Sequence, residues 1–459
     1  MTHLQNDLTR GNIQSQLIRF IIPMLGASFL QAMYSVVDMI IMGHFVGASG
    51  MSSIGIASQV SFTILGLVMG LSVGGGVLFA QYYGANRHED VQETIGTILS
   101  LYVIVALVLA AVAPFVVVPA LRLLKTPVEA FPGAMAYLTI NMCGSIFIFG
   151  YLAISTILRG MGDSERPLIF IAVGTISNIL LDLLFVGRFR MGAAGAAWAT
   201  VIAQGLSLII SVIYLIRKGF LFDFKPSSFR IHSGKLKLLI KIGLPSSIQG
   251  VFLGFSFLYI MTLFNGIGVV ASAVSGIAGR INQFAMLPHM AITTAISPMV
   301  GQNIGAGFYD RAKSTMYMGI KLLLPLATFA FVLVMLFPAA ALRIFTTDPA
   351  VITMGVQYLR CNSWDFLLTA VYFCMNSLIT GSGHTAFVMV NDCLCSVLVR
   401  IPTSILLAQT FHMGIAGMGL AAPAATLVGL LAALVFIQGG FWRRNAIQHQ
   451  EHVVLENEI

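Results

Sequence analysis

A single carboxylate, Asp38, lies in a largely apolar stretch, VVDMIIMGHFVG, at residues 36–47. Tyr34 and Gln31 precede it by one and two helical turns, so the three side chains share one face of a helix. An ionisable group at membrane depth costs several kcal/mol unless it faces a polar interior, which makes Asp38 a candidate functional residue. The alternative is a structural aspartate that caps a helix or pairs with a neighbour.

A second carboxylate, Asp182, lies in SNILLDLLFV, with Asn178 one turn earlier on the same helix face. Thr200 follows in the next apolar segment, AAWATVIAQ. If these helices face one another, Asp38, Asn178, Asp182 and Thr200 form an oxygen-rich cluster. Such a cluster can share a proton, because like charges in a low dielectric resist joint ionisation. It can equally coordinate a small hard cation such as Na⁺, with the same four residues as metal ligands.

The elements that position these side chains follow from composition. The chain has 459 residues, of which 58% are hydrophobic and 9% charged, whereas a soluble domain carries about 25% charged residues. Its apolar runs of roughly 20 residues or more are too long for strands and cross a bilayer as α-helices. The sequence therefore predicts an all-α integral membrane protein.

Twelve transmembrane helices are predicted, in two sets of six. The predicted domains are an N-terminal six-helix lobe at residues 1–216, a basic cytoplasmic connector at 217–236, a C-terminal six-helix lobe at 237–440 and a cytoplasmic tail at 441–459. The predicted spans are residues 16–43, 52–80, 94–121, 133–158, 167–187, 193–216, 238–265, 272–300, 315–342, 353–379, 386–411 and 414–438.

The distribution of basic residues predicts the orientation. With a cytoplasmic N-terminus, fourteen Lys and Arg residues lie in loops and tails on the cytoplasmic side and five on the other side. The positive-inside rule then places both termini in the cytoplasm. The formal net charge of +8 reflects this topology and contact with anionic membrane lipids, so no nucleic-acid partner is implied.

The two halves of the chain are copies of one another. Pro23 in RFIIP and Pro245 in KIGLP lie 222 positions apart, and QYYGAN (81–86) matches QNIGAG (302–307) at an offset of 221. RGMG (159–162) likewise matches TGSG (380–383). Each copy has six spans, an even number, so the copies share one orientation and are expected to be related by a pseudo-two-fold axis along the membrane normal. This architecture suits alternating access and is complete as a monomer.

Two short stretches predict local structure. The glycines of LSVGGGVLFA (71–80) allow a neighbouring helix to approach closely. LRGMGDSERP (158–167) predicts a tight cytoplasmic turn in which Asp163 and Arg166 are solvated.

The second half carries a different set of charges. Asp365 and Asp392 lie in apolar segments together with Arg280, Arg360 and Arg400. Because buried charges are usually paired, we expect internal ion pairs there. The sequence assigns neither their partners nor their role.

Several of these motifs resemble the multidrug and toxic compound extrusion (MATE) family. VVDMIIMGHFVG, QYYGAN, LRGMGDSERP and NILLD occur in the family's order and spacing, and the resemblance covers almost the whole chain. It implies two six-helix lobes in a V-shape and antiport of organic cations or amphiphilic drugs against H⁺ or Na⁺, across the cell inner membrane. It also implies that Asp38, Asn178, Asp182 and Thr200 line a cation-coupling site in the first lobe.

The resemblance extends to residues near that site. Gln31 and Tyr34 match polar positions on the same face and are candidate substrate-binding residues. Pro23 matches the proline at which the first helix bends. Met33 is a further substrate-binding candidate, because methionine adapts to varied apolar ligands.

One departure from the family pattern concerns the second half. The sodium-coupled NorM-type branch has a glutamate in the seventh span, where this chain reads PSSIQGVFLGFSFLY. Asp365 also lies about one turn from the expected acidic position of the tenth span. The chain therefore looks closer to the DinF-like and MepA-like branches, with coupling through the first lobe. Binding of H⁺ or Na⁺ to its acids lowers the local negative charge and so weakens the binding of a cationic substrate.

Other classes of protein fit the sequence less well. A flippase for a lipid-linked or amphiphilic precursor is expected to have a cationic cavity, whereas the first half here is acidic. A major-facilitator transporter is expected to have a GxxxDRxGRR-like loop, and this loop reads YYGANRHEDVQE. An enzyme is not expected, since no nucleophile–base set or metal-ligand spacing occurs, and no cofactor is predicted besides the coupling ion. The sequence leaves the physiological substrate and the choice between H⁺ and Na⁺ open.

Overall fold

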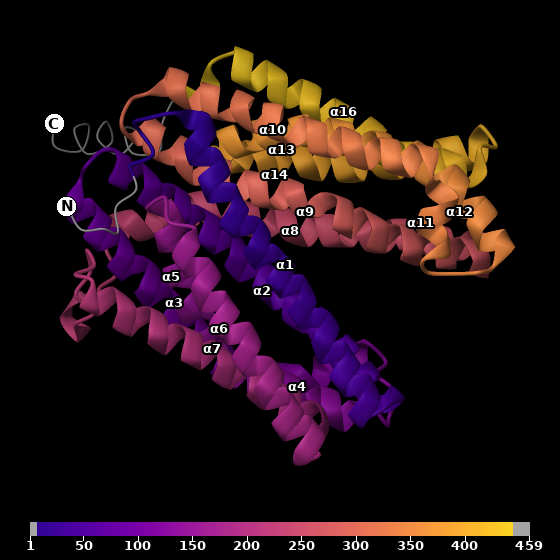
Figure 1. Ribbon diagram of the computed structural model, residues 1–459, viewed down its shortest axis with the longest axis horizontal. Coiled ribbons are helices and arrows are strands. Elements are labelled where there is room, and N and C mark those ends of the chain that lie inside the picture. Colours follow the sequence, from indigo (N-terminus) through magenta and orange to yellow (C-terminus); the bar gives the residue numbers. More distant parts are fainter. Residues whose placement is uncertain (1–6, 444–459) are drawn as a thin grey trace. The chain divides into compact units, whose positions relative to one another are not determined.

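The computed structural model describes residues 7–443, except for the side chains of Ser35, Ala48 and Phe62. Within this range the chain is helical and contains no strand (Figure 1). Most of the predicted tail, from residue 444, lies outside the described residues. The main helices are α1 (Ile13–Phe45), α2 (Ala48–Gly84), α3 (His88–Leu123), α4 (Phe131–Cys143), α5 (Ser145–Gly160), α6 (Glu165–Asp182), α7 (Gly192–Arg217), α8 (Ser233–Ile267), α9 (Val269–Gly305), α10 (Tyr309–Leu336), α11 (Pro338–Arg343), α12 (Pro349–Asn362), α13 (Trp364–Gly381), α14 (Thr385–Leu394), α15 (Ile401–Ile405) and α16 (Gly414–Gln438).

Short π-helical and 3-10 segments interrupt or join these helices. The π-helical segments are η1 (Leu183–Arg188), η3 (Cys395–Arg400) and η4 (Leu406–Thr410), and the 3-10 segments are η2 (Pro226–Ser228) and η5 (Phe441–Arg443). The fifth predicted span thus consists of α6 and η1, and the eleventh runs from α14 to η4.

The described helices account for most of the predicted spans. Ten helical stretches are long and apolar enough to cross a membrane, and the pair α4–α5, bent by 52°, counts as an eleventh span. The bend lies at Gly144, where a Cβ would come within 2.4 Å of the Val201 side chain. The predicted tenth span, 353–379, is divided between α12 and α13 on either side of Ser363.

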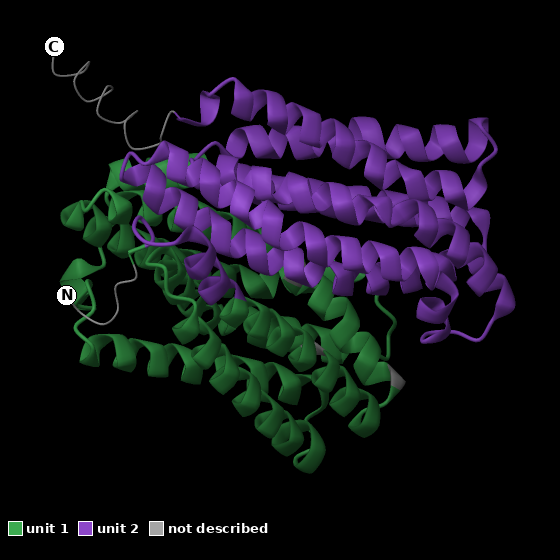
Figure 2. Ribbon diagram, turned by 45° about the horizontal axis from the view of Figure 1, so that its top comes forward, with its two compact units in different colours: residues 1–7, 22–243 green, residues 8–21, 244–459 purple. Residues whose placement is uncertain are grey.

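The chain divides into two compact units (Figure 2). Unit 1 comprises Met1–Asp7 and Ile22–Gly243, and unit 2 comprises Leu8–Ile21 and Leu244–Ile459. Both α1 and α8 therefore begin in one unit and continue in the other. Each boundary falls just before a proline inside the helix, Pro23 in α1 and Pro245 in α8. The boundaries predicted from the sequence, at residues 216 and 237, did not place the start of α1 in unit 2 or the start of α8 in unit 1.

Ionic and aromatic contacts hold the connector against unit 1. Lys235, at 5% exposure, pairs with Asp90 near the start of α3 and lies 4.0 Å from the centroid of the Tyr82 ring. Arg87 pairs with the same carboxylate at 2.6 Å, and Gln92 donates to the Leu221 carbonyl at 3.1 Å. The turn at QYYGAN is thus the place where the connector docks.

The matching turn of unit 2 holds the start of the chain in a similar way. The Leu8 backbone N–H donates to Gln302 Oε1 at 3.1 Å. Arg311 donates to the carbonyl oxygens of Gly11 and Arg10 at 2.8 and 3.0 Å. QYYGAN and QNIGAG therefore both bind the segment that leads into the first helix of a repeat, which explains the assignment of residues 8–21 to unit 2.

The glycine stretch of α2 packs against the first part of α8, as predicted. At Gly74, a Cβ would lie 2.6 Å from both the Gly243 nitrogen and the Leu239 carbonyl oxygen. Only a residue without a side chain allows the two backbones to approach so closely.

A short turn joins α5 and α6 as predicted, but the prediction that its charged side chains are solvated is wrong. Asp163 is only 2% exposed and forms an ion pair with Arg166. Arg166 Nε also donates to the Tyr214 hydroxyl at 3.0 Å. A tertiary contact with α7 thus buries a charge pair that would otherwise be solvated.

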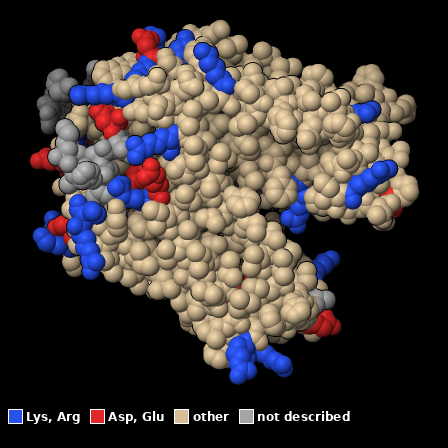
Figure 3. All heavy atoms as spheres, viewed as in Figure 1, with Lys and Arg blue, Asp and Glu red and all other residues tan. Residues whose placement is uncertain are grey.

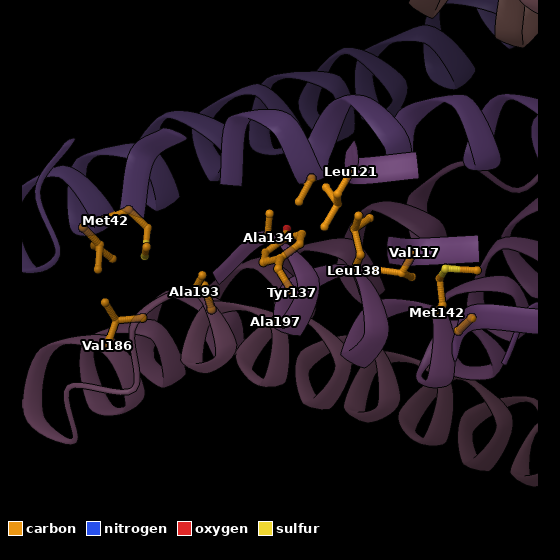
Figure 4. Close-up of a cluster of buried hydrophobic side chains, with 14 residues drawn as sticks. Met42, Val117, Leu121, Ala134, Tyr137, Leu138, Met142, Val186, Ala193 and Ala197 are labelled. Atoms are coloured by element: carbon orange, nitrogen blue, oxygen red, sulfur yellow. The ribbon is translucent and has the colours of Figure 1, made fainter. Parts of the chain in front are cut away.

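Each unit has its own apolar core. In unit 1, Ala134, Tyr137 and Leu138 of α4 pack against Ala193 and Ala197 of α7, together with residues of α2 and α3 (Figure 4). In unit 2, the corresponding cluster joins residues of α8, α9, α12 and α16. In both units, the charged side chains visible in Figure 3 gather mainly at the helix ends, and the surface between those ends is largely uncharged.

The ion pairs expected in the second half are absent from the described residues. Asp365 instead accepts a hydrogen bond from Thr426 at 2.6 Å, and Asp392 accepts from Tyr372 and Gln249. Arg400 lies 4.9 Å from the centroid of the Phe257 ring, while Arg280 and Arg360 are exposed. Neutral donors satisfy both carboxylates, so these arginines are not needed as partners.

Candidate functional site

Three helices of unit 1 bring together the polar residues singled out in the sequence. Helix α1 carries Tyr34 and Asp38, α6 carries Asn178 and Asp182, and α7 carries Thr200. Helices α6 and α7 pack closely along their length. Asp182 is the last residue of α6 before the π-helical segment η1, and such departures from α-helical geometry are frequent at functional sites.

Hydrogen bonds connect these residues across the helices. The Tyr34 hydroxyl and Thr200 Oγ1 lie 3.0 Å apart. The Asn178 amide fits its surroundings best when Nδ2 donates to Asp182 Oδ2 at 2.9 Å and Oδ1 accepts from the Thr200 backbone N–H at 3.2 Å. This orientation is an assignment from the hydrogen-bond network, since it gives each amide atom a partner of the correct kind. Asn178 therefore bridges α7 and the buried carboxylate.

The two carboxylates differ in burial. Asp182 is fully buried, at 0% exposure, and its Oδ1 has no hydrogen-bond partner. Asp38 is half-buried. Both carboxylates are close enough to interact electrostatically with each other and with the Tyr34 and Tyr137 hydroxyls. No Lys or Arg of the described residues pairs with either acid, so the cluster can accept positive charge.

A cavity of about 70 Å³ adjoins this cluster within unit 1. Its lining contains several polar side chains, among them Thr200, Asn178 and Tyr151 of α5. The lining residues are Gln31, Tyr34, Tyr151, Ile171, Gly174, Thr175, Asn178, Thr200, Ala203, Gln204 and Ser207. Polar cavities of this size hold water molecules, and the lining residue Asn178, which donates to Asp182, connects this cavity to the acids.

Of the remaining residues proposed from the sequence, only one lines the cavity. Gln31 is exposed but lines the cavity together with Tyr34. Met33, at 42% exposure, is not among the lining residues. Pro23 is a buried residue inside the continuous helix α1. The roles of these residues in binding or bending stay predictions.

The cavity includes residues that the sequence did not single out. Gln204 lies one turn after Thr200 on α7, and Thr175 lies one turn before Asn178 on α6. Their spacing of three and four residues from known candidates was a signal for a shared face. Tyr137 and Tyr151 carried no such signal, because only the packing of α4 and α5 brings them to the cluster.

The chemistry of the cluster suits a proton or a hard cation. Its possible ligand atoms are carboxylate and hydroxyl oxygens, which such ions prefer. The described residues contain no group of three or more His, Cys, Asp or Glu side chains that would hold a metal ion.

The second half does not repeat this cluster. At an offset of 222, Asp38, Asn178, Asp182 and Thr200 correspond to Ile260, Arg400, Ser404 and Ala422. The two acids have thus become an isoleucine and a serine, while the asparagine has become an arginine. Asp38 and Asp182 thus have no counterparts in the second half, whose acids Asp365 and Asp392 lie at other positions and accept hydrogen bonds from neutral side chains.

The sequence is similar to known transport proteins over most of its length. The family model described as MatE matches residues 23–184 and 245–406. The chain is 29% identical over 437 residues to "Probable multidrug resistance protein YpnP" of Bacillus subtilis (strain 168), covering 95% of this chain and 97% of that protein. It is 23% identical to "Multidrug export protein MepA" of Staphylococcus saprophyticus, covering 93% of this chain and 94% of that protein.

Solved structures share the fold. A structure described as the outward-facing conformation of a multidrug resistance MATE family transporter superimposes with a TM-score of 0.87 at 21% identity, over 96% of this chain and 98% of that one. A MOP superfamily transporter from Pyrococcus furiosus superimposes with a TM-score of 0.85 at 21% identity, over 95% and 97%. The predicted fold class, an all-α membrane protein built as two six-helix lobes, is confirmed by this likeness.

The two matched segments, one in each half, lie either side of the connector and contain the duplicated motifs as well as Asp38, Asn178 and Asp182. This chain is a member of the MatE family of transporters.

Proposed function

We propose that this protein exports organic cations and amphiphilic drugs from the cell by alternating access, in exchange for H⁺ or Na⁺. The observation that carries the proposal is that Asp38, half-buried, and Asp182, fully buried, have no Lys or Arg partner among the described residues and adjoin a polar cavity in unit 1. The names of the relatives YpnP and MepA, a multidrug resistance and a multidrug export protein, support the substrate class. We further propose that the protein acts as a monomer in the cytoplasmic membrane with both termini in the cytoplasm.

The geometry supports a competition mechanism. Asp182 Oδ1 has no partner, so a proton or Na⁺ that binds there gains an interaction without displacing another. The bound charge lowers the negative potential of the cluster and weakens a cationic substrate held near Gln31 and Tyr34. By thermodynamic linkage, the substrate disfavours the bound ion by the same factor. Export against a substrate gradient then follows from inward movement of the ion.

The first test is uptake of a cationic dye into proteoliposomes under a pH gradient or a Na⁺ gradient, imposed separately. Transport driven by the pH gradient identifies a proton antiporter, and transport driven only by Na⁺ identifies a sodium antiporter. An absence of dye movement under both gradients would contradict the proposal and favour a flippase for a lipid-linked or amphiphilic precursor.

The hydrogen bond between Tyr34 and Thr200 gives a second, smaller prediction. Tyr34→Phe removes the hydroxyl that lies 3.0 Å from Thr200 Oγ1 and keeps the ring. Loss of one such bond is worth about 0.5–1.5 kcal/mol, so the apparent affinity for the coupling ion should change by up to roughly tenfold. The measurement is the ion-concentration dependence of dye transport. Tyr317→Phe, at an exposed position of unit 2, is the matched control and should leave it unchanged.

A further inference from the structure

Arg159 is a cation without a carboxylate partner among the described residues. It lies in the last turn of α5, at the end of unit 1 where the turn to α6 and the connector also lie. Its Nη1 donates to Ser155 Oγ at 3.0 Å and its Nη2 donates to Thr156 Oγ1 at 3.1 Å. Both hydroxyls belong to its own helix and are neutral, so the positive charge of Arg159 is not cancelled.

The surroundings of Arg159 argue against a side chain that merely reaches the lipid headgroups. Arg159 is half-buried, and its hydrogen-bond partners Ser155 and Thr156 are 4% and 5% exposed. Tyr102 and Tyr151 are close enough to interact with its charge. A cation held in this way at the edge of the membrane is costly, and such residues generally serve a function.

Arg159 lies on the same helix as Tyr151, a lining residue of the polar cavity that adjoins the acids. Tyr151 lines the cavity together with Asn178 and Thr200. Tyr151, Ser155 and Arg159 follow one another at intervals of four residues, so they lie on one face of α5, and the helix rises about 12 Å from Tyr151 to Arg159. The Tyr151 hydroxyl donates to the Pro167 carbonyl at 3.1 Å. A line of polar groups thus leads from the acids to Arg159.

The comparison of the two halves links Arg159 to the acids. At an offset of 221, Arg159 corresponds to Thr380. The half that has Asp38 and Asp182 also has this arginine, whereas the half with Ile260 and Ser404 lacks it. A purely structural role in ending the helix would be needed in both halves.

We propose that Arg159 is a fixed positive charge that closes the cytoplasmic end of the cavity in unit 1 to cations. An arginine in a narrow polar passage excludes protons and metal cations by repulsion. Arg159 therefore prevents H⁺ or Na⁺ from leaking past Asp38 and Asp182 into the cytoplasm when no substrate is carried. This role rests on the proposed antiport and on the predicted orientation. In this role Arg159 does not bind the coupling ion. It ensures that the ion crosses the membrane only in exchange for substrate.

The test measures ion leak into proteoliposomes in the absence of drug, with an entrapped pH-sensitive or Na⁺-sensitive dye. We expect Arg159→Met to raise the leak at least about tenfold over the wild type, as Coulomb repulsion over roughly 10 Å at an effective dielectric constant near 20 gives a factor of this order. Arg159→Lys keeps the positive charge, so its ion leak should equal that of the wild type. Arg122→Met removes an exposed cation from the other end of unit 1. It is the matched control, and its ion leak should also equal that of the wild type.

A double variant shows where the leak runs. If it passes the acids, Arg159→Met combined with Asp182→Asn should return the leak to the wild-type level. The proposal is overturned if the ion leak of Arg159→Met equals that of the wild type, or if Arg159→Lys leaks as much as Arg159→Met. It is also overturned if the double variant leaks as much as Arg159→Met alone. Should Arg159→Met fail to elute as a folded protein, Arg159→Gln takes its place.

Dye transport by the wild type in the same vesicles separates the two hypotheses. Coupled dye transport together with a tight Arg159→Met variant overturns the role of Arg159 and leaves the antiport intact. Absence of coupled transport in the wild type overturns the proposed function itself.

Discussion

Asp182→Asn is expected to abolish ion-driven export while leaving the protein folded in the membrane. The asparagine keeps the shape of the side chain and can still bond with Asn178, but it can no longer exchange a proton or hold Na⁺ by charge. The rate of dye uptake driven by the pH or Na⁺ gradient should fall by at least about 100-fold, the equivalent of roughly 3 kcal/mol. The measurement is dye uptake in proteoliposomes, with size-exclusion elution as the test of folding.

Two further variants sharpen this expectation. Asp38→Asn should have a similar effect, and the double variant should be little worse than either single one, because residues that act as a unit are strongly non-additive. Asp223→Asn is the matched control: Asp223 lies in the connector and is well exposed, so the variant should transport normally. Driven uptake by Asp182→Asn at the wild-type rate would show that coupling does not pass through this cluster.

Much of the site could be predicted from the sequence, because an ionisable residue within an apolar run is costly in a membrane and therefore points to a function. Asp38 and Asp182 stand out for that reason, and helical spacing assigns Tyr34 and Asn178 to the same faces. The structure does bring these residues together with Thr200. Tyr137 and Tyr151 could not be found in this way, since their contribution depends on how α4 and α5 rotate in the packed bundle.

The wrong predictions share a physical cause. Asp163 was expected in solvent, but it is buried and pairs with Arg166, which in turn donates to the Tyr214 hydroxyl of α7. Asp392 was expected to pair with an arginine, but Tyr372 and Gln249 donate to it. In both cases a residue distant in sequence contributes to the environment of the carboxylate, Tyr214 through Arg166 in the first and Gln249 directly in the second. The assignment of residues 8–21 to unit 2 is similar, because it depends on Gln302 and Arg311.

The duplication clarifies what is structural and what is functional. Features that recur in both halves, such as the helix-internal Pro23 and Pro245 or the docking turns QYYGAN and QNIGAG, serve the fold of both units. Asp38, Asp182 and Arg159 occur in one half only. Transport chemistry is therefore expected from unit 1, although both units are built on the same plan.

The close approach of α2 and α8 leads to a prediction about stability. Gly74→Ala adds a Cβ 2.6 Å from the Gly243 nitrogen and the Leu239 carbonyl oxygen, and rigid backbone atoms cannot move aside as a flexible side chain can. Overpacking of this kind costs typically about 1–3 kcal/mol. We expect a lower Tm in detergent, measured by thermal unfolding of the purified protein.

The same pair of helices supplies graded controls for this prediction. At Gly243, a Cβ would meet Leu71 Cα at 3.0 Å, and at Gly66, also on α2, it would meet nothing within 4 Å. Gly243→Ala should therefore lower the Tm less than Gly74→Ala does. Gly66→Ala should leave the Tm unchanged or raise it, because alanine favours a helix over glycine by about 1 kcal/mol. Equal melting temperatures for Gly74→Ala and Gly66→Ala would mean that the two helices are not packed at Gly74.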